Sequence, residues 1–134
     1  MEIIDSHTHV DNVEPWVDPP EKLIGLMDEA NIQKAVIMTY CDTPIAKEDG
    51  LDYIIASVKK FPDRLIGYAR LHPQAKQKAI ALLEEVVRDH RFMGLKFHPE
   101  SNKTRPYHEA SLALIRKAGG AEYPDFVSLR RRVA

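Results

Sequence analysis

Four short apolar segments constrain the fold of this chain more than any other feature of its sequence. They start near Ile3, Ala35, Leu65 and Met93, some 26 to 33 residues apart, and apolar residues at helical spacing follow each of them. A strand–helix–strand unit of this length joins parallel strands through a right-handed crossover. The sequence therefore predicts an α/β fold with about four βα units and a parallel sheet.

Charge and length exclude several classes of protein. The 134 residues contain 19 Lys and Arg against 20 Asp and Glu, so no net charge favours nucleic acid or a membrane surface as partner. We therefore expect a small-molecule substrate. The single cysteine, Cys41, excludes an internal disulfide and fits a reducing cytoplasm. Since no signal peptide and no apolar run of membrane-helix length is present, the sequence predicts a cytoplasmic protein.

Two histidines end the first predicted strand. On a β-strand alternate side chains share a face, so His7 and His9, with Asp5 behind them, line one face at the carboxyl end. Two imidazoles placed in this way can bind one metal ion, and histidine is a common nitrogen ligand of zinc. The spacing leaves an alternative open, in which both are surface or hydrogen-bonded histidines.

The third and fourth predicted strands end in the same pattern. Arg70-Leu71-His72-Pro73 matches Lys96-Phe97-His98-Pro99, and each has a glycine earlier in its strand. By alternation each cation shares a face with the histidine two residues later, while proline ends the strand. We therefore expect cations and imidazoles to gather at the carboxyl ends of the strands.

The remaining connections are predicted from capping residues. Residues 11–20 are polar and proline-rich and should form a loop over the end of the first strand. Asp18 should cap the next helix with Pro19 at its first position, and Asn31 should end that helix. A final helix should run over residues 108–118 and end at Gly119-Gly120.

Asp5-Ser6-His7-Thr8-His9, followed by repeated βα units, resembles the amidohydrolase superfamily of metal-dependent TIM-barrel enzymes, in its amidohydrolase-related branch. That branch includes hydrolases and metal-dependent decarboxylases. A full (βα)8 barrel needs about 250 residues, so the resemblance implies a partial barrel. Residues 1–118 correspond to the N-terminal half of the barrel, and residues 119–134 form a truncated or divergent tail.

The resemblance implies roles for the histidine pair and for the fourth strand. His7 and His9 would be metal ligands, with zinc as the expected divalent metal and manganese as the alternative. Lys96 and His98 would be catalytic residues that bind the anionic group of a substrate or assist proton transfer. In binuclear members a fourth-strand lysine is carboxylated and bridges two metals, a role that the resemblance also allows for Lys96. Alternatively, Lys96 has a buried stem and pairs with Asp5 or Glu100.

Three further residues are candidates for substrate binding. Arg70 and His72 lie at the end of the third strand, where barrel-interior packing and hydrogen bonding are the alternative. Trp16 could stack on a substrate or pack within a lid. A catalytic zinc site uses three protein ligands, so His72, His98 or a histidine from a second subunit is expected to complete the set.

These features predict a metal-dependent hydrolase that acts on a small carboxylate, amide or ester/lactone substrate. The alternatives are a metal-dependent decarboxylase of the same family and a catalytically incomplete half-barrel. Since a half-barrel exposes the edge of its last strand and its inner face, we also expect a homodimer or higher homo-oligomer.

Overall fold

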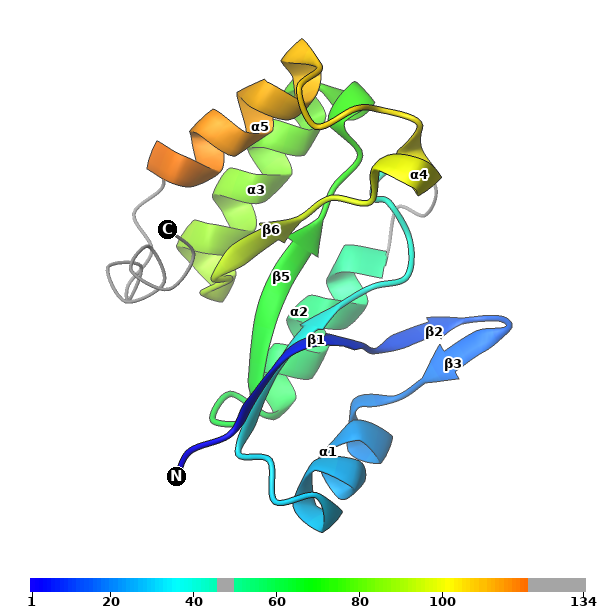
Figure 1. Cartoon of the computed structure of the whole chain (residues 1–134), viewed down its shortest axis with the longest axis vertical. Helices are drawn as coiled ribbons and strands as arrows, with labels where there is room; N and C mark the ends of the chain where they lie inside the picture. Colours follow the sequence, from blue (N-terminus) through cyan, green and yellow to red (C-terminus); the bar gives the residue numbers. More distant parts are fainter. Residues whose placement is uncertain (46–49, 121–134) are drawn as a thin grey trace.

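The four predicted strands form one parallel sheet, as the sequence indicates (Figure 1). A computed structural model describes residues 1–45 and 50–120. The strands follow one another across the sheet in the order β1-β4-β5-β6. Because each new strand adds beside the previous one, the sheet grows in one direction, as in a barrel wall. The strands are β1 (Ile4–His9), β4 (Lys34–Met38), β5 (Leu65–Arg70) and β6 (Gly94–Lys96).

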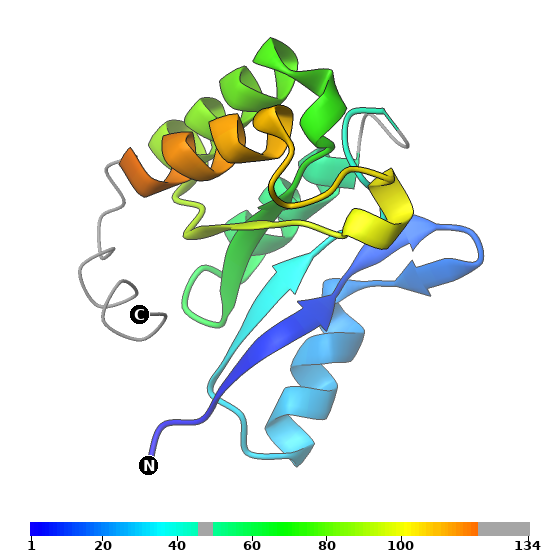
Figure 2. The same ribbon diagram turned by 45° about the horizontal axis from the view of Figure 1, so that its top comes forward.

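Helices connect the strands and cover one face of the sheet (Figures 1 and 2). Ala35 and Ile37 of β4 and Leu65 and Ala69 of β5 are fully or almost fully buried in one apolar cluster with residues of these helices. The main core therefore lies between the sheet and the helical layer. The helices are α1 (Pro20–Glu29), α2 (Gly50–Lys60), the 3₁₀ turn η1 (Pro73–Ala75), α3 (Gln77–His90), α4 (Pro99–Asn102) and α5 (Glu109–Gly120).

Two strand glycines allow aromatic rings to pack against the sheet. A Cβ atom on Gly67 would lie 2.7 Å from the ring of Phe92, which is fully buried. A Cβ atom on Gly94 would lie 2.5 Å from the ring of Tyr68. The glycines that recur early in the third and fourth strands thus have a packing role, because any side chain there would displace a ring.

The predicted loop over residues 11–20 is wrong in detail. It contains an antiparallel hairpin of β2 (Asp11–Val13) and β3 (Trp16–Asp18), whose pairing was hidden by the polar and proline-rich sequence. The next helix starts one residue later than predicted, since Pro19 is its N-cap and Pro20 its first residue.

The ends of the helices are partly confirmed. Asn31 has a φ of 58°, the left-handed conformation predicted to follow the first helix. The final helix begins at Glu109 and includes Gly119 and Gly120, rather than ending before them. Most of the predicted tail, residues 121–134, lies outside the described residues.

Within residues 1–45 and 50–120, no helix is both long and apolar enough to cross a membrane.

β1 and β6 stand at the two edges of the described sheet, each with one neighbouring strand. Unpaired backbone groups along such edges can accept a further strand.

Candidate metal and ligand site

His7 and His9 lie side by side at the end of β1. Their Nε2 atoms are 3.2 Å apart, and their ring centroids are 5.1 Å apart with the planes tilted by 53°. Two nitrogens each 2.0–2.1 Å from one zinc ion, at a tetrahedral angle, are about 3.3 Å apart. This separation fits two ligands of one metal ion, and it also fits a hydrogen bond between the two rings, the alternative that the sequence left open.

The strand β1 is irregular at the position of His7. The pairing of β1 with β4 shifts between Asp5 and Thr8, so His7 lies in a bulged segment. Asp5 Oδ1 accepts a hydrogen bond of 3.1 Å from the backbone N–H of His7, and Thr8 Oγ1 donates to the carbonyl of Val36 at 2.7 Å. Bulges commonly redirect side chains next to functional sites. Here the bulge holds the segment that carries His7.

The backbone that follows β4 orients the ring of His9. Its Nδ1 atom lies 3.3 Å from the carbonyl oxygen of Thr39, which follows β4. Since a carbonyl only accepts, Nδ1 carries the proton and Nε2 keeps its lone pair for an ion. Burial lowers the pKa of His9, with further lowering by His7, Arg70 and Lys96, while the hydrogen bond to Thr39 opposes this shift. The lowered pKa favours the neutral ring, the form that binds metals.

An aromatic stack connects the histidine pair to the hairpin. The ring of Tyr40 lies 4.3 Å from that of His9 and nearly parallel to it, and Trp16 stacks on Tyr40 at 5.7 Å. The Tyr40 hydroxyl donates to Asp18 Oδ2 at 3.1 Å. Trp16 remains 52% exposed. The structure thus brings Trp16 to the edge of the site, and a role for it in substrate binding stays a prediction.

Asp11 organises the site and was not singled out from the sequence. Its carboxylate is fully buried and accepts hydrogen bonds from the Thr39 hydroxyl, from the Tyr40 N–H at 3.0 Å and from the Asn12 N–H at 2.8 Å. These bonds fix the chain after β4, which supplies both the Thr39 carbonyl and the Tyr40 ring. An aspartate two residues beyond the histidine pair is the signal that could have revealed it.

Arg70 belongs to a buried ion pair. Its Nε donates to Asp42 Oδ1 at 3.0 Å, and the two residues are only 5% and 2% exposed. Asp42 Oδ2 also accepts a hydrogen bond of 2.5 Å from the hydroxyl of Ser101 in α4. The hydrogen-bonding alternative for Arg70 is therefore present in the structure, and a substrate role stays a prediction. Asp42 was not singled out from the sequence either.

Lys96 is the register partner of Arg70 across β5 and β6, so the two matching sequence patterns stand side by side. It is close enough to His9 to contribute to that residue's lowered pKa. The predicted ion pair of Lys96 with Asp5 or Glu100 does not occur among the described residues. Whereas Asp42 neutralises Arg70, the lysine therefore remains a positive charge near the histidine pair.

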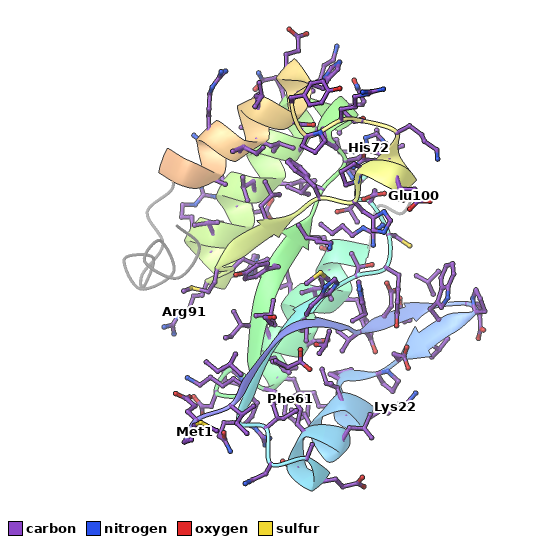
Figure 3. The ribbon with its side chains drawn as sticks, in the orientation of Figure 1. Met1, Lys22, Phe61, His72, Arg91 and Glu100 are labelled. Carbon is purple, nitrogen blue, oxygen red and sulfur yellow. The ribbon has the colours of Figure 1, made fainter. Side chains whose placement is uncertain are left out.

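His72 and His98 are N-caps of the turns that follow β5 and β6. His72 Nδ1 accepts from the Gln74 N–H at 3.2 Å, and His98 Nδ1 accepts from the Ser101 N–H at 3.1 Å. Figure 3 shows His72 and Glu100 at the end of the molecule opposite Met1, where the strands finish. In the part of the chain that the structure describes, no group of three or more His, Cys, Asp or Glu could hold a metal ion. The predicted third ligand is thus not brought to the His7–His9 pair.

No protein-family model and no curated protein matches the chain. Solved structures do match its fold. The 5-carboxyvanillate decarboxylase from Novosphingobium aromaticivorans, complexed with manganese and 4-hydroxy-3-methoxy-5-nitrobenzoic acid, matches with a TM-score of 0.70 and 16% identity over 87% of this chain and 47% of its own.

Two further structures match similarly. A probable 2-pyrone-4,6-dicarboxylic acid hydrolase from Acinetobacter baumannii, with citric acid bound, has a TM-score of 0.60 and 17% identity over 88% of this chain and 46% of its own. A 2,6-dihydroxybenzoate decarboxylase complexed with 2,6-dihydroxybenzoate has a TM-score of 0.63 and 15% identity over 87% and 45%. The chain therefore has the fold of amidohydrolase-type hydrolases and decarboxylases, as a partial (βα)8 barrel that spans under half of their length.

Proposed function

We propose that this chain is the metal-binding part of a metal-dependent hydrolase that acts on a small carboxylate, amide or ester/lactone substrate. The observation that carries the proposal is the 3.2 Å separation of the Nε2 atoms of His7 and His9. A neutral His9, held through Nδ1 by the Thr39 carbonyl, supports it. A bound divalent metal, zinc or alternatively manganese, would supply a Lewis acid at this point.

The other residues of the site would bind and orient the substrate. Lys96 offers a positive charge for an anionic group, because its neighbour Arg70 is neutralised by Asp42. Trp16 presents a half-exposed ring beside Tyr40, on which a planar substrate can stack. Arg70 is buried, so it would act through its ion pair with Asp42, which holds the carboxyl end of β5 against the segment after β4.

Decarboxylation is the second candidate function. It is favoured by two matched structures, which are named as decarboxylases of substituted benzoates and carry aromatic acids. The Trp16–Tyr40 stack suits an aromatic ring. Two assays would distinguish the activities. One measures the release of carbon dioxide from 2,6-dihydroxybenzoate, and the other measures the hydrolysis of 2-pyrone-4,6-dicarboxylate.

Metal binding is the experiment that tests the proposal first. Titration of the metal-free protein with zinc should give about one ion per chain, and His7→Ala should weaken binding at least tenfold, because one of two ligands is lost. His90→Ala at the end of α3 is the matched control and should leave zinc affinity unchanged. Negligible zinc binding by the wild-type chain would contradict the proposal and favour the alternative of a non-catalytic half-barrel.

We also propose that the chain associates with itself. The edges of β1 and β6 in the described sheet are both open, and a second copy can add a parallel strand to each. Sedimentation velocity at micromolar concentration should show a dimer or higher oligomer. A stable, compact monomer under these conditions would contradict this part of the proposal.

A further inference from the structure

The hydrogen-bond partners at Nδ1 divide the histidines of the site into two chemical types. A neutral imidazole carries one proton, so a nitrogen that accepts a hydrogen bond leaves the proton on the other nitrogen. At His9 the Nδ1 partner is a carbonyl, which accepts. At His72 and His98 it is a backbone N–H, which donates. The two strand-end histidines are therefore protonated at Nε2, the reverse of His9.

Local structure fixes both rings in this state. Each histidine follows a strand, is followed by a proline at the first position of a turn, and caps that turn with Nδ1. Releasing the ring would break its hydrogen bond with the backbone N–H of Gln74 or Ser101, and loss of an N-cap side chain weakens a helix start. The cap thus opposes any tautomer with a free Nδ1.

The cap of His98 has a second support. Ser101 donates its backbone N–H to His98 and its hydroxyl to Asp42, and Asp42 is held by the buried guanidinium of Arg70. The ring at the end of β6 is therefore linked to the end of β5 through Ser101, which is exposed, and through the buried Asp42–Arg70 pair. This arrangement places His98 more firmly than a cap alone would.

We infer that His72 and His98 are neutral Nε2–H donors that bind an oxygen of an anionic ligand, and that neither is the third metal ligand. A metal ion needs the lone pair of Nε2, which a ring capped through Nδ1 does not offer. A carboxylate oxygen needs a donor, which both rings supply. By strand alternation Lys96 shares the face of His98, and adds the positive charge that such a ligand needs.

This inference rests on the proposed function for the identity of the ligand, a small carboxylate. It also corrects the prediction that His72 or His98 completes the metal shell. Because residues 1–45 and 50–120 of one chain hold no suitable group of three, a histidine from a second subunit is left, of the candidates predicted above, as the third protein ligand.

Nitrogen NMR of the ¹⁵N-histidine-labelled protein tests the tautomers directly. We expect the Nδ1 of His72 and His98 to be unprotonated and Nε2 to be protonated in the metal-free protein. Addition of zinc should shift the resonances of His7 and His9 and leave the tautomers of His72 and His98 unchanged. A proton on Nδ1 of either capping ring, or zinc ligation by either, would overturn the inference. Unchanged His7 and His9 resonances would instead count against the proposed function.

A variant that keeps the cap separates the two roles of His98. In His98→Asn the side-chain oxygen can still accept from the Ser101 N–H, since asparagine is a favoured N-cap. Zinc affinity should stay within twofold of the wild type, while affinity for 2,6-dihydroxybenzoate, used as the carboxylate probe, should fall about tenfold or more. A zinc affinity reduced at least tenfold, or unchanged affinity for the probe, would contradict the role as a ligand-binding donor.

Discussion

Replacing Asp42 with alanine should destabilise the chain strongly, because the variant leaves the Arg70 guanidinium buried without a carboxylate. Arg70 is 5% exposed and Asp42 is 2% exposed. Removing one partner of a buried ion pair costs about 3–5 kcal/mol. Loss of the hydrogen bond from Ser101 adds about 1 kcal/mol. The expected loss of about 4–6 kcal/mol is a large part of the roughly 5–15 kcal/mol by which domains are stable.

Urea unfolding, followed by circular dichroism, measures this loss. Asp89→Ala is the matched control, since Asp89 pairs with Arg88 on the surface, where the two side chains are 45% and 70% exposed. An exposed pair contributes at most about 1 kcal/mol. Asp42→Asn keeps the size of the side chain and provides a second measurement if Asp42→Ala does not fold.

The double variant Asp42→Ala/Arg70→Met tests the cause of the effect. Removing both charges should recover part of the loss, because methionine needs no partner in an apolar site. The reasoning would be refuted if Asp42→Ala cost no more than Asp89→Ala, since the ion pair would then be as well solvated as a surface pair.

Three further predictions concern packing, pH and metal. Gly67→Ala should lower the free energy of unfolding by about 1–3 kcal/mol, because its Cβ would meet the ring of Phe92 at 2.7 Å; urea unfolding checks this, and an unchanged midpoint would contradict it. Burial raises the pKa of Tyr68 above 10.0. The contribution of Tyr68 to the free energy of unfolding should therefore be fully present below about pH 10 and be lost as the pH rises through the pKa of the folded protein. Unfolding across this range should show a shallower fall for Tyr68→Phe than for the control Tyr107→Phe at an exposed site. Removing zinc with EDTA from protein loaded at about 100-fold excess over Kd should lower the melting temperature by several degrees, and His7→Ala should abolish that difference.

Local patterns in the sequence were sufficient for much of the fold. The apolar run Ala35–Met38 predicted a buried parallel strand, and Asn31 predicted the end of α1, because period and backbone preference act over a few residues. The hairpin of β2 and β3 escaped prediction, since its pairs Asp11–Asp18 and Val13–Trp16 carry no clear alternation of apolar and polar residues.

For the site, the sequence alone predicted which side chains lie together at the ends of the strands, while their roles stay predictions. His7 and His9 were expected on one face, and their Nε2 atoms converge; Arg70 and Lys96 were matched by pattern, and they are register partners. The sequence could not show which partner Asp42 has, because Arg70 is 28 residues away and Ser101 is 59 residues away along the chain.

What the sequence determined by itself is the succession of strands and helices and the set of residues at the strand ends, since alternation and capping are short-range properties. Only the tertiary structure decided the chemistry of each histidine. Whether Nδ1 faces the carbonyl of Thr39, as at His9, or a backbone N–H in a following turn, as at His98, depends on which segment packs beside the ring. That contact assigns the proton, and the proton determines whether an imidazole can bind a metal ion or donate to an anion.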